Sequence, residues 1–452
     1  MKGFIIYSTY RVIDNKSYVL LYGRLENNQS FLTINEFRPY FFIETSDLNK
    51  AIKIKKLEYD RTNLKNFQGK LMTKVLVIFP QDVPHIRTEF EKHKIKTYES
   101  DIRFPIRFLI DNKIQGSLDI EGEYEINHET IDRVYREPKL TPTKYVPKNL
   151  KVLSLDIESD KKGKKLYCVS LFSKNYKKTL LVSNKSFYDV ISCRDEEELL
   201  NKLREEIISL DPDIITGWNV IDFDLSFLKD KFKEYGIPFI LGRDNSVCKI
   251  RLESNFFKSS KADFSGRVVL DGLDLAQSPS RFNPFIKLEN YRLDTAAQKI
   301  LGKTKLIVLI GKEKYEEIDR LYKEDQKKLV EYNLLDAELT YRVIIEGKLL
   351  DLTIQRSLLI GMHLDRVNAS IASLDFLYLQ RARDKGLVCP TNLGNEWEAR
   401  IKGGYVMESL PGIYENIILL DFKSLYPSKK QTINIDPSVY LEKKKRNSIE
   451  SP

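Results

Sequence analysis

The ten residues LKVLSLDIES at positions 150–159 decide how the central part of this chain folds. Their apolar first half predicts a buried strand. Alternate side chains of an extended chain point to the same face, so Asp156 and Glu158 lie on one side of the expected strand. Two carboxylates on one face can reach the same metal ion.

Two further motifs follow in order along the chain. Residues 218–224, WNVIDFD, place the amide of Asn219 and the carboxylate of Asp224 at a predicted strand-to-helix junction. Tyr332 and Asp336 lie in a helical pattern, where a spacing of four puts both on one helix face. Carboxylates from separate elements are the ligands that a Mg²⁺ ion needs when it acts on a phosphate. A lone Asp-x-Glu is more often a capping or turn feature, and only the three motifs together indicate phosphodiester chemistry.

The ordered motifs resemble the proofreading 3′–5′ exonuclease domain of family B DNA polymerases, whose signatures are Asp-x-Glu, Asn-x-x-x-Phe/Tyr-Asp and Tyr-x-x-x-Asp. The resemblance implies a chain of α/β and α+β domains, with an RNase H-like exonuclease between a β-rich N-terminal domain and an incomplete polymerase palm. It also implies that Tyr332 orients the attacking water, while Asn219 and Phe223 position the DNA strand. Two Mg²⁺ or Mn²⁺ ions would be held by four carboxylates, those of Asp156, Glu158, Asp224 and Asp336.

A second resemblance, to polymerase motif A, lies near the C-terminus. The residues DFKSLYPS at 421–428 follow Ile417–Leu420, which we expect to form a strand. The likeness implies that Asp421 is a catalytic metal ligand, and that Tyr426 excludes ribonucleotides. Phe422, Ser424 and Leu425 would lie along the incoming triphosphate, and Gly403, Gly404 and Tyr405 resemble a segment that tracks the template strand. The alternatives are a strand that ends in a Tyr-Pro turn and an ordinary glycine turn.

The N-terminal segments 37–40, 80–84 and 101–111 resemble the archaeal branch of the family, where they form a pocket for template uracil. Arg103 stands where archaeal relatives commonly have proline, which alters the expected shape of the pocket. The alternative interpretation is that these are ordinary core and turn residues. The pocket residues implied by the likeness are Tyr7, Pro39, Tyr40, Val83, Phe104 and Arg107.

Composition agrees with this interpretation. The 452 residues suffice for two to four domains, and a net charge of +9 suits a polyanionic partner. The four cysteines form no CxxC pair, so neither a zinc knuckle nor a disulfide framework is indicated. No stretch approaches the length of a transmembrane helix. We therefore expect a cytoplasmic, nucleoid-associated protein without a membrane partner.

Changes in the residue pattern along the chain predict four consecutive parts. The N-terminal template-binding and uracil-recognition domain spans 1–147, and the exonuclease domain spans 148–347. A helical segment at 348–389 packs on the N-terminal domain, and a partial palm occupies 390–452.

The sequence lacks motifs B and C, which supply the nucleotide-binding helix and the second palm aspartate of a complete polymerase. Lys429 and Lys430 also stand where relatives carry apolar residues, which suggests exposure, a divergent partner surface or a degraded palm. We therefore expect the N-terminal part of a split or truncated family B DNA polymerase. Its partners would be primer-template DNA, single-stranded 3′ ends, deoxynucleoside triphosphates and a second subunit carrying motifs B and C, with a sliding clamp as a further candidate. The alternatives are a stand-alone 3′–5′ exonuclease with a vestigial palm and a non-catalytic DNA-binding assembly subunit.

Overall fold

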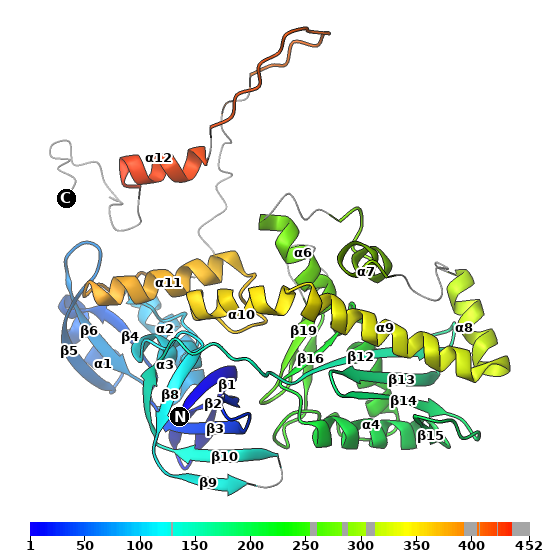
Figure 1. The fold of residues 1–452 in the computed structure, drawn as a ribbon. Helices are drawn as coiled ribbons and strands as arrows, with labels where there is room; N and C mark the ends of the chain where they lie inside the picture. The colour runs from blue at the N-terminus through cyan, green and yellow to red at the C-terminus, as the bar shows by residue number, and fades with distance from the viewer. Residues whose placement is uncertain are drawn as a thin grey trace. The chain divides into compact units, whose positions relative to one another are not determined.

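The protein is described by a computed structural model, drawn in Figure 1. The chain divides into two compact units. The first comprises Met1–Pro39, Ile78–Pro80 and Arg103–Arg381, and the second comprises Tyr40–Val77, Gln81–Ile102 and Ala382–Pro452. The structure describes residues 1–127, 130–253, 260–282, 288–303, 312–392, 405, 407–422 and 424–435.

A seven-stranded sheet forms the N-terminal part of the first unit. The first two strands along the chain, Lys2–Ile13 and Lys16–Leu25, are joined through Asp14 and Asn15. The φ angles of these two residues, 48° and 61°, suit a tight hairpin turn. Helix α3 (Phe104–Asp111) packs on these strands. In sheet order the strands are β11 (Lys139–Pro142), β8 (Ser117–Glu121), β1 (Lys2–Ile13), β2 (Lys16–Leu25), β3 (Ser30–Glu36), β10 (Ile131–Arg136) and β9 (Tyr124–Asn127).

The second sheet of the first unit has six strands, with β12 (Val152–Ser159) inside it. Strand β12 runs antiparallel to β13 and parallel to β16, so the strand predicted at 150–159 is central and buried. In sheet order the strands are β15 (Val190–Cys193), β14 (Tyr176–Val182), β13 (Leu166–Ser173), β12, β16 (Ile214–Gly217) and β19 (Val268–Asp271).

Helices cover both faces of this second sheet (Figure 1). Odd-numbered residues of β12, such as Leu155, pack in one core with helices α4 (Glu196–Leu210) and α5 (Ser226–Glu234). The opposite face lies under helix α9 (Gln326–Glu346). This alternation assigns the even-numbered side chains of β12 to the α9 side.

The second unit contains a four-stranded sheet with two helices. Chain returning from α11 joins this sheet, because Leu387 bridges to Lys65 and Pro390 bridges to Tyr98. In sheet order the strands are β5 (Glu58–Lys65), β6 (Leu71–Leu76), β4 (Tyr40–Glu44) and β7 (Thr97–Tyr98), and the helices are α1 (Leu48–Ile54) and α2 (Val83–Lys92).

Further helices connect these layers. The helical segment predicted at 348–389 contains α10 (Leu349–Ile360) and α11 (Ser370–Asp384). The linear domain boundaries at 147, 347 and 389 stay predictions. The other elements are α6 (Gly272–Phe282), α7 (Leu293–Leu301), α8 (Lys312–Glu324) and a small hairpin of β17 (Lys249–Arg251) and β18 (Lys261–Asp263). No helix among the described residues is long and apolar enough to cross a membrane.

The strand expected at Ile417–Leu420 is wrong, because the structure shows no strand there and these side chains are largely exposed. A strand needs neighbouring strands to pair with, and within the described part of the chain these residues have none. Helix α12 (Leu425–Ile433) follows and carries Lys429 and Lys430 on exposed positions. Gly403 and Gly404 lie outside the described residues.

Candidate metal centre

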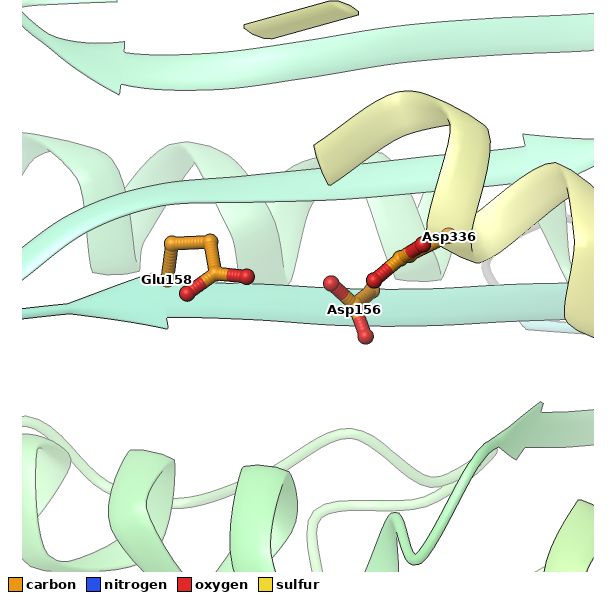
Figure 2. A group of neighbouring side chains, drawn as sticks. All are labelled: Asp156, Glu158 and Asp336. Carbon is orange, nitrogen blue, oxygen red and sulfur yellow. The ribbon is translucent and has the colours of Figure 1, made fainter. Parts of the chain in front are cut away.

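Three of the four predicted metal-binding carboxylates meet on the α9 side of β12. Asp156 and Glu158 come from alternate positions of that strand, and Asp336 comes from α9 above them (Figure 2). Each side chain offers one carboxylate oxygen, and the three oxygens lie within 4.8 Å of one another. Glu158 and Asp336 are buried, and Asp156 is half-buried. The packing of α9 on β12 therefore brings together residues that are 180 positions apart in the sequence.

Lys314 on α8 is the cation beside this cluster. Its Nζ atom lies 3.4 Å from Glu158 Oε1 and 5.5 Å from the centre of the Tyr332 ring. Burial alone would lower the pKa of Lys314, but Glu158, Asp156 and Asp336 together hold it above its ordinary value. Lys314 therefore stays charged. Sequence analysis missed this residue, because nothing in this run of charged residues marks one lysine as the partner of the acidic cluster.

The carboxylates outnumber the cation, and this donor set fits a hard divalent metal. Three carboxylates and one ammonium leave a formal charge of −2 in a largely buried site. Mg²⁺ and Mn²⁺ prefer oxygen ligands of this type. A cation at this position would balance the cluster, which makes Asp156, Glu158 and Asp336 the residues that would hold it.

Tyr332 lies one helical turn before Asp336 and is almost completely buried. Burial raises the pKa of its phenol, and the charges of Asp336, Glu158 and Asp156 raise it further. The hydroxyl therefore remains protonated at neutral pH and can donate a hydrogen bond.

Asp224 is buried beside β12 but is not one of the three grouped carboxylates. Its Oδ1 atom accepts a hydrogen bond of 3.0 Å from the backbone N–H of Ile157, between the two β12 ligands. Burial raises its pKa well above the ordinary value, and Asp271 and Glu158 add to that effect. Asp224 thus ties its own turn, a π-helical segment at Ile221–Leu225, to β12. Its role as a metal ligand stays a prediction.

Asn219 begins that turn in a left-handed conformation, with φ of 60°, which asparagine adopts more readily than most residues. Asp271, at the end of β19, accepts hydrogen bonds from the backbone N–H groups of Asn219, Ile221 and Leu273 at 3.0, 3.2 and 2.9 Å. Burial, followed by the charge of Asp274, raises the pKa of Asp271 to about 7. Sequence analysis missed Asp271, although its position at the end of an apolar strand was a usable signal.

Phe223 leaves a large aromatic ring partly in solvent, with 42% of the residue exposed. It lies between Asp222 and Asp224 in the same π-helical turn. Bases of single-stranded DNA stack on exposed rings of this kind.

The motif A residues are exposed. Asp421, Phe422 and Ser424 precede helix α12, and Leu425 and Tyr426 begin it. No described residue packs around them as a palm, so their predicted roles remain predictions.

The residues predicted to form the uracil pocket are split between the two units. Arg103, which replaces the expected proline, is exposed and immediately precedes α3. The Tyr7 hydroxyl donates a hydrogen bond to Asp263, and Arg107 is buried. Tyr7, Pro39, Phe104 and Arg107 belong to the first unit, and Tyr40 and Val83 belong to the second, so the pocket itself stays a prediction.

The mixed sheet between two layers of helices, with an acidic cluster on β12 and α9, fits the RNase H-like fold that the sequence predicted. A model of the exonuclease domain of DNA polymerase family B matches residues 95–296, and a model of DNA polymerase family B matches residues 319–451. The chain belongs to DNA polymerase family B. The first match contains Asp156, Glu158 and Asp224, and the second contains Asp336 and Asp421.

Similar proteins come from both bacteria and archaea. DNA polymerase II of Escherichia coli is 33% identical over 356 residues, which cover 77% of this chain and 43% of that protein. The DNA polymerase of Desulfurococcus sp. is 27% identical over 458 residues, covering 96% of this chain and 54% of that protein. The chain thus spans about half the length of these relatives.

A solved structure shares the fold. The family B DNA polymerase from Pyrobaculum calidifontis matches with a TM-score of 0.78 and 22% identity, covering 100% of this chain and 59% of that chain. At this identity the likeness establishes the fold alone.

Proposed function

We propose that this chain carries the metal-dependent 3′–5′ proofreading exonuclease of a family B DNA polymerase. The observation that supports the proposal is the meeting of Asp156, Glu158 and Asp336 within 4.8 Å. Because the chain belongs to a DNA polymerase family, we expect its substrate to be DNA. A net charge of +9 suits that polyanion. A protein with this activity would work at the nucleoid.

The three carboxylates would hold Mg²⁺ or Mn²⁺, and Asp224 would help to hold a second ion after losing its proton. Such ions stabilise the developing charge on the phosphate and the leaving 3′ oxygen. The protonated Tyr332 hydroxyl would orient the attacking water, while the Lys314 ammonium offsets part of the carboxylate charge. The exposed Phe223 ring would stack on a terminal base, and Asn219 would fix the strand beside it.

The test is digestion of a 5′-labelled single strand with Mg²⁺, with Mn²⁺ and with EDTA. We expect a ladder that shortens from the 3′ end, faster for single strands and mismatched ends than for paired ends. Asp156→Ala combined with Glu158→Ala should abolish it by removing metal ligands, a loss of about 10³-fold or more. An undiminished rate in the double variant would contradict the proposal. A folded wild-type protein that degrades no DNA would favour a non-catalytic assembly subunit.

We also propose that the chain contributes motif A to DNA synthesis. Asp421 would be one palm metal ligand and Tyr426 the gate against ribonucleotides, and both lie in the matched polymerase region. Motifs B and C are not in the printed sequence. Further residues of the same polypeptide, or a second chain, would have to supply them.

Primer extension tests this second role. The 452-residue chain should not extend a primer by itself, and it should do so when a polypeptide carrying motifs B and C is added. In that assembly Asp421→Ala should remove synthesis and spare the exonuclease. Robust synthesis by the chain alone would refute this assignment of motif A.

The N-terminal likeness supports a further proposal, preferential binding of template strands that contain deoxyuracil. A pocket that includes Val83 should exclude the C5 methyl group of thymine. Val83 is half-buried at the start of α2 and packs against the core there, so a melting curve must accompany the binding test of Val83→Gln. We expect Val83→Gln to abolish the preference in fluorescence anisotropy at one fixed salt concentration. Equal wild-type affinity for uracil and thymine strands would contradict a working pocket.

A further inference from the structure

We propose that Asn333 is a positioning residue that orients the Asp156 carboxylate for the divalent cation. This inference deepens the proposed exonuclease function and rests on it. Asn333 follows Tyr332 in α9 and was not singled out by any sequence motif.

The amide of Asn333 contacts the candidate metal ligand directly. Its Nδ2 atom donates a hydrogen bond of 2.6 Å to Asp156 Oδ2, which links α9 to the central strand β12. A carboxylate oxygen accepts and an amide nitrogen donates, so the nitrogen end of the amide must face Asp156. The asparagine amide carries no charge, so it can hold the Asp156 oxygen in place without offsetting the charge of a carboxylate.

The other end of the same amide is also held. Asn333 Oδ1 accepts a hydrogen bond of 3.5 Å from the Cys168 thiol. Cys168 lies on β13 directly opposite Glu158, on the α9 side of the sheet. An amide oxygen can only accept, so the Cys168 thiol is the donor of this hydrogen bond. With partners at both ends, the amide cannot rotate without losing a buried hydrogen bond.

A role in packing alone is the competing explanation. Asn333 is completely buried on a helix whose other buried residues, such as Leu329 and Ala337, are mostly apolar. Leucine has nearly the same shape as asparagine and removes both hydrogen bonds, so it fills the same space at some cost in stability. Packing alone therefore predicts that leucine at 333 leaves the Mn²⁺ affinity unchanged. Positioning predicts a loss of metal affinity, because partners that orient ligands typically contribute 10- to 100-fold.

The experiment measures Mn²⁺ binding to the whole chain without DNA, by titration calorimetry, with melting curves recorded in EDTA. We expect Asn333→Leu to raise the Mn²⁺ dissociation constant about tenfold or more, with a cooperative melting curve in EDTA that shows the variant to be folded. Thr340→Val is the matched control, because Thr340 is a buried polar residue two turns further along the same helix. It should leave the Mn²⁺ affinity unchanged.

The possible outcomes separate the two levels of the proposal. Wild-type Mn²⁺ affinity in a folded Asn333→Leu protein would overturn the positioning role and leave the exonuclease proposal intact. Wild-type protein that binds no more Mn²⁺ than the Asp156→Ala, Glu158→Ala double variant would overturn the metal centre itself. If the leucine variant does not fold, Asn333→Ser decides in the same way, since it removes the amide and leaves room for water. A folded serine variant with wild-type affinity would refute the role.

Discussion

Two groups of largely buried acidic residues lie beside neighbouring strands of one sheet, and the charges around them differ. Asp156, Glu158 and Asp336 lie near the ammonium of Lys314, which is 3.4 Å from Glu158 Oε1. A second group precedes β16, the strand next to β12, and there two aspartates face three guanidinium groups. The acidic residues of this second group, here called the arginine-locked pair, are Asp211 and Asp213.

The arginine-locked pair accepts several charge-assisted hydrogen bonds from buried arginines. Arg24 Nε lies 3.0 Å from each oxygen of Asp213, and Arg243 donates to Asp213 and Asp211 at 2.7 Å each. Arg267 donates to Asp211 at 3.0 Å. All three arginines are buried, and Arg24 comes from β2 of the other sheet of the same unit. The pair therefore fastens the N-terminal sheet to the nuclease sheet.

This difference in local charge distinguishes acidic residues that stabilise the fold from acidic residues that can bind a metal ion. The arginine-locked pair carries formal positive charge to spare, so it has no use for a metal ion. Counted with Lys314 alone, the three metal-centre carboxylates carry two negative charges in excess, which a divalent cation can balance. Burial and acidity alone would not have told the two groups apart.

Asp213→Asn should have the largest effect on stability. It leaves buried guanidinium groups of Arg24 and Arg243 short of a counter-charge, which typically costs about 3–5 kcal/mol. Urea unfolding followed by circular dichroism would measure this loss. Asp189→Asn is the matched control, because Asp189 pairs with Lys178 at 3.8 Å in solvent and should change stability little. Equal losses in the two variants would contradict the structural role of the locked pair.

Tyr332→Phe should lower the exonuclease rate and leave the folding stability unchanged, whereas Asp213→Asn should lower the stability. It removes the buried hydroxyl that would orient water, and leaves all carboxylates in place, so the exonuclease rate should fall about 10²-fold. The folding stability should stay near that of the wild type. Single-turnover digestion of a labelled strand measures the rate, and Tyr322→Phe serves as control, since its hydroxyl donates to the Val182 carbonyl. A normal rate in Tyr332→Phe would remove this residue from the mechanism.

Acid should weaken the locked pair. Burial alone would raise the pKa of Asp213, but Arg243 and Arg24 hold it below its ordinary value, and the same balance applies to Asp211. A depressed pKa contributes stability that is present above about pH 4 and is lost as the pH falls through the lower folded value. Urea midpoints recorded between pH 5 and 3 should therefore drop, with a shallower slope in Asp213→Asn. An unchanged slope in that variant would show that other carboxylates carry the acid sensitivity.

The smallest expected effect is a gain. Asp336→Asn removes one of three clustered negative charges, so in EDTA it should stabilise the chain, by roughly 0.5–2 kcal/mol for a site held in a functional arrangement. Excess Mg²⁺ should reverse the order, because the wild type then gains a ligand that the variant binds less well. A loss of stability in EDTA would mean that these carboxylates do not repel one another.

The sequence predicted the part of the site that depends on local periodicity. A period of two placed Asp156 and Glu158 on one strand face, and a spacing of four placed Tyr332 and Asp336 on one helix face, and the structure brings three of these carboxylates together. It could not predict Lys314 or Asn333, because their roles depend on how α8 and α9 lie against the sheet. The sequence around Lys314 and Asn333 does not distinguish them from a lysine or an asparagine on a solvent-exposed helix face.

The strand predicted at Ile417–Leu420 failed for a related reason. Four apolar residues favour a strand, but pairing depends on partners elsewhere in the chain, and the described residues provide none. Asp224 was predicted as a metal ligand, and that role stays a prediction. The structure adds a contact that the motif did not predict, a hydrogen bond from the backbone N–H of Ile157 to Asp224 Oδ1.

The most direct test of the charge deficit is the melting temperature of the intact chain, measured in EDTA and in rising Mn²⁺. A ligand that binds only the folded state stabilises it in proportion to the logarithm of its concentration above the dissociation constant. The melting temperature of the wild type should rise with Mn²⁺, and that of the Asp156→Ala, Glu158→Ala variant should not. An equal rise in both proteins would place the cation elsewhere and contradict the assignment of this acidic cluster as the metal centre.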